Sequence, residues 1–249
     1  MFISSPFEQF QIVSFLPIKF GTLNLSFTNS SFYMLLVVLF IIALFALSTQ
    51  KATIIPSRWQ SIVEMLYEFV HNLVEEQVGP KGLRYFPVLF SVFLFILVSN
   101  LLGMIPYSFT VTSHIIVTFG LALAVFIGIN IIGLSIHGAH FFSLFLPQGA
   151  PLALAPFLVL IELISYLFRV VSLAVRLFAN MMSGHSLLKI LSGFAWTMMC
   201  MGGFMFVASF IPLAIIFALT GLELAIAFLQ AYVFTLLTCI YLNDAINLH

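Results

Sequence analysis

Residues 157–183 read FLVLIELISYLFRVVSLAVRLFANMMS, a run of 27 residues that contains neither glycine nor proline. Continued to Leu191, this run predicts one helix of about 35 residues, which at 1.5 Å per residue is about 52 Å long. The hydrocarbon core of a bilayer is only about 30 Å thick, so an upright helix of this length does not fit within it. We therefore expect a steeply tilted helix. The equally long apolar stretch 204–247 is expected to pair with it as a hairpin that turns near Gly202 and Gly203.

The composition of the whole chain agrees with a membrane protein and excludes a soluble domain. Of the 249 residues, 63% are hydrophobic and 6% are charged, whereas soluble domains are about 45–50% apolar and about 25% charged. The predicted fold class is an all-α integral membrane protein with about five membrane-spanning helices and one interfacial amphipathic helix. We expect a single membrane domain over residues 1–249, with an N-terminal tail (1–31), a first crossing (32–50), the interfacial helix (54–79), two further crossings (86–105 and 115–137) and the long tilted hairpin (156–249).

The interfacial helix is predicted from polar residues that recur at helical spacing between Pro56 and Gly79. Ser57 and Gln60 form a candidate capping box at its start. The apolar face opposite the polar residues is expected to hold Trp59, Leu66, Phe69 and Leu73.

Basic residues predict how the chain is oriented in the membrane. Four of the eight, Lys51, Arg58, Lys81 and Arg84, lie between the first two crossings, whereas the turn 106–114 has none. Because basic loops stay on the inner side, the segment 51–84 is expected inside. The N-terminus is then outside and the C-terminus inside.

Ionisable side chains within the last two apolar helices are candidate functional residues. Each one costs about 2.5–3.5 kcal/mol to insert into a membrane, so it is rarely present without a role. On the first helix the spacing of seven places Glu162, Arg169 and Arg176 on one face, to which Asn180 returns. The group comprises Glu162, Arg169, Arg176, His185, Lys189, Glu223 and Asp244.

An antiparallel hairpin brings these residues together at three levels. The pairs expected are Glu162 with Asp244 toward the inside, His185 with Glu223 toward the outside, and Arg176 with Gln230 between them. Carboxylates and histidine exchange protons near neutral pH, whereas a guanidinium keeps its charge. The pattern therefore predicts a proton path with two separate entrances, in which Arg176 blocks direct leakage.

Simpler interpretations of some of these residues stay open. Glu162 with Arg169 is also consistent with a buried structural ion pair, and Lys189 with a side chain that extends to the membrane surface. His137 and His140 have a spacing that a metal site would tolerate, but a polar loop is favoured.

No cofactor or resident metal is expected. Cys200 and Cys239 lie in apolar runs without metal-type spacing, which indicates structural thiols. The chain has no GxxxxGK[ST] phosphate loop, so it is not expected to bind or hydrolyse ATP by that motif.

Residues 176–185, RLFANMMSGH, resemble the hallmark stretch of the ATP synthase subunit a family. Histidine at 185 with glutamate at 223 is similar to the mitochondrial and alpha-proteobacterial pattern, and Ser183 stands where alanine is usual in the family. The likeness continues at SPFEQF (5–10), NLLGMIPY (100–107), HG (137–138), FF (141–142) and LP (146–147).

The resemblance implies a stator subunit that offers two offset proton half-channels to a rotating c-ring. Arg176 would face the ring carboxylates, with Asn180 and Gln230 supporting it and Arg169 assisting. Protons would enter past His185 and Glu223, ride on the ring, and leave by Glu162 and Asp244. The implied partners are the c-ring, the peripheral stalk, other membrane-sector subunits and the lipid bilayer, with protons as the transported ion and no nucleic acid. The implied location is the mitochondrial inner membrane, with the N-terminus toward the intermembrane space and the C-terminus toward the matrix.

Two other functions are compatible with charged residues at mid-membrane. A secondary proton or sodium antiporter would also place acids and an arginine there, although the chain lacks the internal repeat that many transporters show. A purely structural assembly subunit would use the charged faces as packing pairs only.

Overall fold

The computed structural model describes residues 6–17, 19–20, 23–24, 26–50, 53–105, 108–138, 141 and 155–247. The chain divides into two compact units, each built from three separate segments. Unit 1 comprises Met1–Ile42, Phe95–His114 and Leu177–Ala231, and unit 2 comprises Ala43–Leu94, Ile115–Arg176 and Tyr232–His249.

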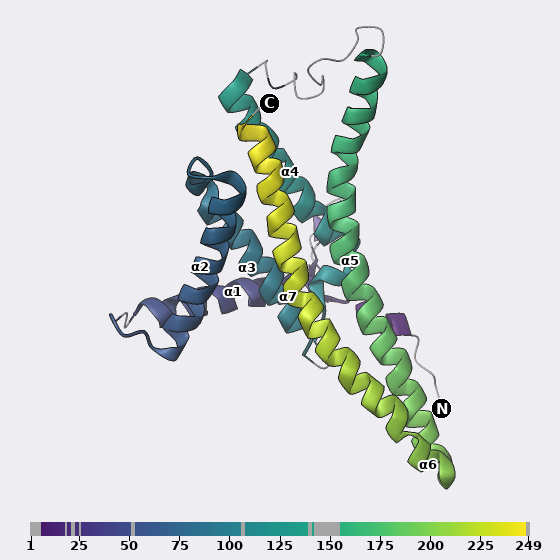
Figure 1. Cartoon of the computed structure of the whole chain (residues 1–249). Helices are drawn as coiled ribbons and strands as arrows, with labels where there is room; N and C mark the ends of the chain where they lie inside the picture. Colours follow the sequence, from purple (N-terminus) through teal and green to yellow (C-terminus); the bar gives the residue numbers. More distant parts are fainter. Residues whose placement is uncertain are drawn as a thin grey trace. The chain divides into compact units, whose positions relative to one another are not determined.

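Long apolar helices dominate both units (Figure 1). They are α1 (Asn29–Thr49), α3 (Phe86–Gly103), α4 (Ile115–His137), α5 (Ala155–Met201) and α7 (Phe210–Ile246). Among the described residues, five helical segments are long and apolar enough to cross a membrane. The predicted all-α fold with five long apolar helices is therefore confirmed.

The last two helices form the predicted hairpin. The first of them, α5, has 47 residues and ends at Met201, beyond the expected Leu191, because Gly184 and Gly193 lie within the helix without ending it. Its length is about 70 Å at 1.5 Å per residue. The turn lies at Gly202 and Gly203, whose φ angles of 70° and 59° are left-handed and favour glycine.

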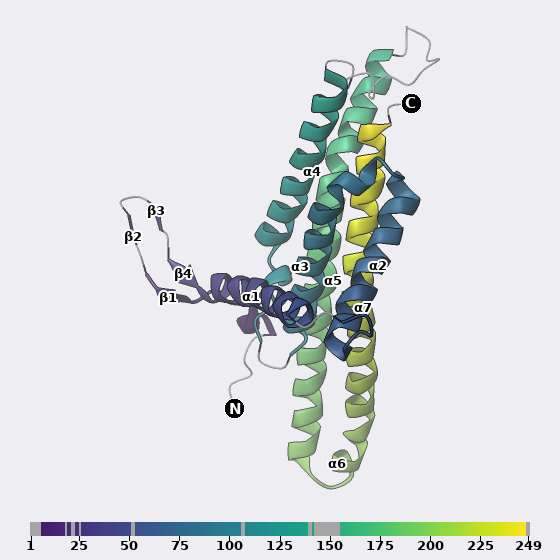
Figure 2. The same cartoon turned by 90° about the vertical axis from the view of Figure 1, so that its left-hand side faces the viewer.

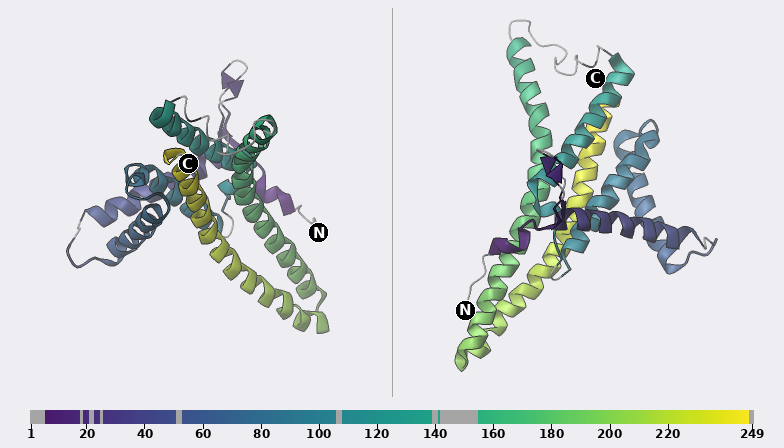
Figure 3. Two further views of the ribbon diagram at one scale, coloured as in Figure 1. Left: turned by 45° about the horizontal axis from the view of Figure 1, so that its top comes forward. Right: turned by 180° about the vertical axis from the view of Figure 1, so that it is seen from behind.

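Within unit 1, the part of α5 after Arg176 and the part of α7 before Tyr232 run side by side to this turn (Figures 2 and 3). The short helix α6 (Phe204–Ala208) stands between the turn and α7. Their steep tilt in a membrane stays a prediction.

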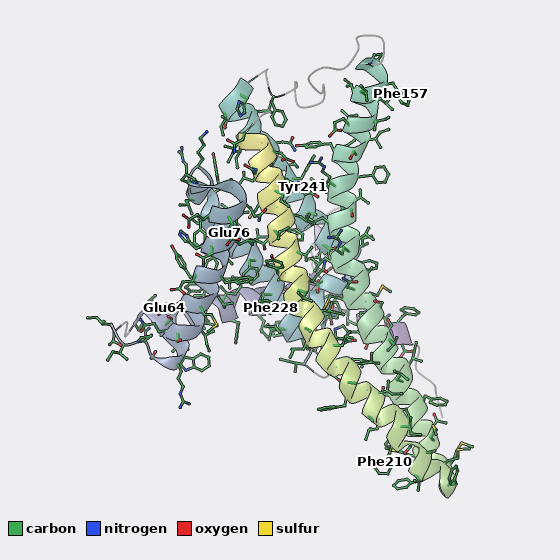
Figure 4. All side chains as sticks on the ribbon, viewed as in Figure 1. Glu64, Glu76, Phe157, Phe210, Phe228 and Tyr241 are labelled. Atoms are coloured by element: carbon green, nitrogen blue, oxygen red, sulfur yellow. The ribbon has the colours of Figure 1, made fainter. Side chains whose placement is uncertain are left out.

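The amphipathic helix α2 (Arg58–Val78) belongs to unit 2. Its first turn is capped by Ser57, whose hydroxyl accepts the Gln60 N–H at 3.4 Å. The reciprocal half of the predicted capping box is wrong, because Gln60 Oε1 accepts the Thr53 N–H at 3.3 Å instead of the Ser57 N–H. The Gln60 amide donates to the Thr53 carbonyl (3.0 Å) and to Glu64 (2.8 Å; Glu64 is labelled in Figure 4). The helix ends at Gly79, which has a φ of 76°, and the 3-10 helix η2 (Gly82–Tyr85) follows.

The buried face of α2 differs from the predicted one. Of the predicted apolar residues only Leu73 is buried, and Trp59 is 57% exposed. The helix packs on its valines, and the larger aromatic residues lie at the edge, where the Phe69 ring is 5.9 Å from that of Phe93. The buried residues are Gln60, Val63, Val70, Leu73, Val74 and Val78. The interfacial position of α2 stays a prediction.

The N-terminal region is more ordered than the expected tail. It contains the 3-10 helix η1 (Pro6–Phe10) and two antiparallel strand pairs. In one pair β1 (Ser14–Leu16) lies beside β4 (Phe27–Thr28), and in the other β2 (Lys19–Phe20) lies beside β3 (Leu23–Asn24). The expectations for Ser5, Pro106, Tyr107, His140, Phe142 and the LP pair at 146–147 lie outside the described residues.

Candidate functional site

One group of charged residues lies in unit 2, which we call the Arg169 cluster (Glu162, Arg169 and Asp244). The Arg169 guanidinium on α5 donates from Nη1 to Asp244 Oδ2 on α7 at 3.3 Å. Its Nη2 lies 3.8 Å from Oε1 of Glu162, which is about two turns earlier on the same helix. The two acidic residues predicted to meet are thus joined through a shared arginine.

Two aromatic rings lie near this guanidinium. Its central carbon lies 5.8 Å from the centre of the Tyr166 ring and 5.3 Å from that of Tyr241 (labelled in Figure 4), which is the range of cation–π attraction. The Tyr166 hydroxyl donates to Asn130 Oδ1 on α4 at 2.8 Å. We did not predict these three residues. Each tyrosine stands one helical turn before a charged residue, Arg169 or Asp244, and that spacing was the available signal.

A second group lies in unit 1, which we call the Glu223 cluster (Gly184, His185 and Glu223). Glu223 on α7 is only 8% exposed, and its carboxylate lies directly against Gly184 on α5. A Cβ atom placed on Gly184 would be 2.6 Å from Glu223 Oε1 and 3.0 Å from its Cδ. Glycine at 184 is therefore what leaves room for this carboxylate.

The titratable atoms of the Glu223 cluster are buried, and their side chains line two cavities. His185 Nε2 and Glu223 Oε2 have no hydrogen-bond partner within the described part of the chain. Both residues line a cavity of about 190 Å³, together with Asn180 and Gly184, and also a larger one of about 910 Å³. Either volume is well above the roughly 30 Å³ that one water molecule occupies in the liquid. The predicted pair His185 and Glu223 thus lines the same two cavities.

The amide pair near the middle of α5 is also in unit 1. Asn180 Nδ2 donates to Gln230 Oε1 at 2.9 Å, and Gln230 is buried. Arg176, four residues before Asn180 on α5, has an exposed side chain. No hydrogen bond or ion pair joins Arg176 to another residue that the structure describes. That Arg176 and Gln230 lie at the same level of the hairpin stays a prediction.

The remaining candidates have local roles in the structure. His137 Nε2 lies 2.9 Å from the Ile246 carbonyl, near the end of α7. Lys189 is twelve residues before the end of α5 and lines the larger cavity. The interpretation of Lys189 as a side chain that extends to the membrane surface assumed a position near a helix end, which the structure does not show. Cys200 is exposed and Cys239 is buried, both as free thiols. Within the described ranges, no group of three or more histidine, cysteine or acidic residues could hold a metal ion.

The family described as ATP synthase A chain matches residues 31–243. The chain belongs to this family. It is 60% identical over 249 residues to ATP synthase subunit a of Marchantia polymorpha, which covers 98% of this chain and 99% of that protein.

Other relatives give the same result along nearly the whole chain. The protein named ATP synthase subunit a is 59% identical over 254 residues in Brassica napus, covering 98% of this chain and 97% of that protein. The Chondrus crispus protein of the same name is 56% identical to this chain over 247 residues, which cover 99% of this chain and 98% of that protein. The chain is accordingly a multi-pass membrane protein and a proton-translocating stator subunit of the membrane sector of ATP synthase. The antiporter alternative receives no support.

Proposed function

We propose that the chain provides two offset proton half-paths to a rotating c-ring, and that Arg176 is the barrier between them. The observation that carries this proposal is the exposed side chain of Arg176 on a long apolar helix, with no ionic partner among the described residues. A guanidinium that cannot lose its charge is costly to leave alone in hydrocarbon. It therefore needs a partner from another chain, and an ionised carboxylate on a neighbouring helix fits this need.

The surface around Arg176 supports close approach by such a helix. Small side chains at a helix surface let another backbone come near, as they do at membrane helix interfaces. The exposed residues of α5 near Arg176 include the small Ser172, Ala179 and Ser183. The hydrogen bond between Asn180 and Gln230 would hold the amide next to Arg176 in one orientation.

The two clusters supply the two half-paths. A proton would reach the ring carboxylate past His185 and Glu223, whose unpartnered atoms face cavities. After nearly a full turn the carboxylate would meet Arg176, which favours its charged form, so the proton is released. The proton would leave by Glu162 and Asp244, with Arg169 holding the two acids in place. Each proton would contribute about 2.3 kcal/mol per 100 mV of membrane potential.

The proposed location is the mitochondrial inner membrane. The N-terminus would face the intermembrane space and the C-terminus the matrix, on the basis of the basic residues between the first two crossings. The proposed partners are the c-ring, the peripheral stalk and other membrane-sector subunits, consistent with membership of the ATP synthase A chain family.

The proposal is tested with Arg176→Ala in the assembled complex, reconstituted into vesicles. We expect ATP-driven proton pumping to be lost while passive proton leak persists or rises, because the barrier and the ring contact disappear together. Arg84→Ala is the matched control, since Arg84 is an exposed arginine outside the apolar core of α3, and it should pump normally. Pumping that survives Arg176→Ala would mean that Arg176 is structural and that the two-path proposal is wrong.

A further inference from the structure

The larger cavity of unit 1 extends beyond the Glu223 cluster to the N-terminal segment of the chain. Its volume is about 910 Å³, and its walls come from η1, the start of α1, the segment after α3, and α5 and α7. The titratable and charged residues that line it are Glu8, Tyr33, His185, Lys189 and Glu223. The exposed carboxylate of Glu8 and the nearly buried carboxylate of Glu223 therefore border one continuous space.

The N-terminal segment is fixed in this position by Asn29, the first residue of α1. The Asn29 amide donates to the Gln11 carbonyl at 3.0 Å, and its Oδ1 accepts the Val13 N–H at 3.2 Å. The Asn29 backbone N–H also donates to the Val13 carbonyl at 3.0 Å. Three hydrogen bonds from one residue thus hold the chain that follows Glu8 and keep η1 at the wall of the cavity.

We propose that Glu8 is a proton-relay residue at the solvent end of this cavity, and that Asn29 is the residue that positions it. The proposal rests on the proposed role of His185 and Glu223 in the outer half-path. A proton from bulk water would bind a carboxylate oxygen of Glu8. That O–H bond would then break toward a water in the cavity, regenerating the Glu8 carboxylate, and water would pass the proton to His185 Nε2 or Glu223 Oε2.

Two observations indicate where the proton is taken up and where it is received. Glu8 is exposed, so it exchanges with bulk solvent, and a carboxylate in a cleft raises the local concentration of cations and their association rate. Glu223 is 8% exposed and its Oε2 has no partner among the described residues, so it can accept a proton without breaking an existing bond.

The test measures ATP synthesis by the assembled complex in vesicles, driven by an imposed proton gradient, as a function of the pH on the outer side. We expect Glu8→Gln to lower the rate by up to about tenfold at high outer pH, where proton delivery is limiting, and to have no effect at low outer pH. Glu8→Asp should restore the rate, because it returns the carboxylate. The control Gln9→Ala changes another residue of the cavity wall that cannot titrate and should behave as wild type.

Two parallel variants separate the possible outcomes. If Glu223→Gln abolishes synthesis but Glu8→Gln follows the wild-type pH profile, the relay role of Glu8 is wrong and the outer half-path stands. If Glu223→Gln also has no effect, the proposed function fails and the relay role fails with it. A rate lowered equally at every pH by Glu8→Gln, and not restored by Glu8→Asp, would assign Glu8 a purely structural role.

The presence of water in the cavity is tested by thiol labelling in a Cys200→Ser background, since Cys239 is buried. Thr220→Cys places a thiol in the cavity wall, and Leu224→Cys places one on an exposed part of α7 that does not line the cavity. A water-soluble, membrane-impermeant thiol reagent should modify the first and not the second. Failure to modify Thr220→Cys would indicate that lipid or another subunit fills the cavity, which would overturn the relay.

Discussion

The Arg169 cluster and the Glu223 cluster lie on the same two helices but differ in how their charges are satisfied. In the Arg169 cluster one guanidinium forms ion pairs with two carboxylates and lies near two tyrosine rings. In the Glu223 cluster an imidazole nitrogen and a carboxylate oxygen are buried without partners among the described residues and border cavities. The first arrangement fixes its groups in place, and the second leaves them able to take up protons.

This difference suggests a division of work along the path. Unpaired buried polar atoms cost about 1–3 kcal/mol each, so they persist where function or water uses them. An ion pair, in contrast, also fixes the position of the side chains that form it. We therefore expect variants of the Glu223 cluster to affect proton transfer most, and variants of the Arg169 cluster to affect both transfer and local structure.

The largest effect is expected for Glu223→Gln. The amide keeps the shape of the side chain but cannot carry a proton, so proton-driven ATP synthesis should fall by on the order of 10²-fold or more, as for other acid–base groups. Glu223→Asp should keep part of the rate, because it retains a carboxyl group at a shorter reach. If the Glu223→Gln complex synthesised ATP at the wild-type rate, the Glu223 cluster would have no role in proton transfer. The proposed difference in function between the two clusters would then be wrong.

Gly184→Ala is expected to have the next largest effect. The new Cβ would lie 2.6 Å from Glu223 Oε1, so the flexible carboxylate must move, and a displacement near 1 Å can cost up to about 10²-fold in rate. The fold should tolerate the change, because alanine is favoured over glycine within helices by up to about 1 kcal/mol. The measurement is synthesis rate together with the melting temperature of the complex.

Gly193→Ala is the matched control for this variant. Gly193 lies on the same helix, but a Cβ there meets no atom within 4 Å. It should keep the wild-type rate with equal or higher stability. Equal rates for both variants would show that the position of the Glu223 carboxylate is not critical.

Sequence reasoning identified the ionisable residues of both clusters but not the role of Gly184 or this difference between the clusters. The antiparallel register of the hairpin follows from chain length and the glycines at 202 and 203, so it places Glu162 near Asp244 and His185 near Glu223. The sharing of Arg169 between the two acids depends on the rotation of α5 against α7, which a register does not specify. The larger cavity depends on side chains from five separate stretches, including the N-terminal segment that was expected to be a simple tail.

The buried face of α2 is a second feature that the sequence did not predict correctly. Its existence follows from helical spacing of polar residues, but the buried stripe is the valine side, and Trp59 is on the outside. The rings of Trp59 and Phe69 are large and mostly apolar, so they pack as well at the edge of a helix as in its buried stripe. The pattern of hydrophobicity alone could not distinguish the two faces.

A smaller effect is expected for single changes in the Arg169 cluster. Glu162→Gln or Asp244→Asn should each lower synthesis by about tenfold, below the 10²–10⁴-fold typical of a sole acid–base group, because the other carboxylate remains. The double variant should lose much more than the product of the two single losses. The measurement is the synthesis rate of all four complexes.

The stability of these complexes distinguishes the alternative that the cluster is a structural ion pair. The three side chains are 30–42% exposed, so each pair contributes only about 0.2–1 kcal/mol. If the double variant synthesises ATP normally and shows only a lower melting temperature, the Arg169 cluster is structural and the inner half-path must lie elsewhere.

The smallest effect is expected for a change of His114. This variant tests whether a loss of activity at low pH comes from lower stability of unit 1 or from slower proton transfer. His114 precedes α4, and its ring stacks on that of Phe109 with the ring centres 5.1 Å apart. Burial lowers the pKa of His114 below its ordinary value of 6.5. Below about pH 6.5, His114 therefore binds a proton in the unfolded chain more readily than in the folded chain. The stabilisation is complete above the ordinary pKa and declines as the pH falls through it.

His114→Gln should flatten this dependence, because glutamine does not titrate. Melting temperatures of the complex at about pH 7.5 and about pH 5.5 should differ less in the variant than in wild type. The pH profile of proton-driven synthesis should stay unchanged, since His114 does not line either cavity of the Glu223 cluster. A shifted synthesis profile would mean that the group of titratable residues serving the outer half-path extends to His114. In that case the titratable residues of the Glu223 cluster would extend farther into unit 1 than His185 and Glu223. The contrast with the Arg169 cluster, whose charges are paired, would then be greater.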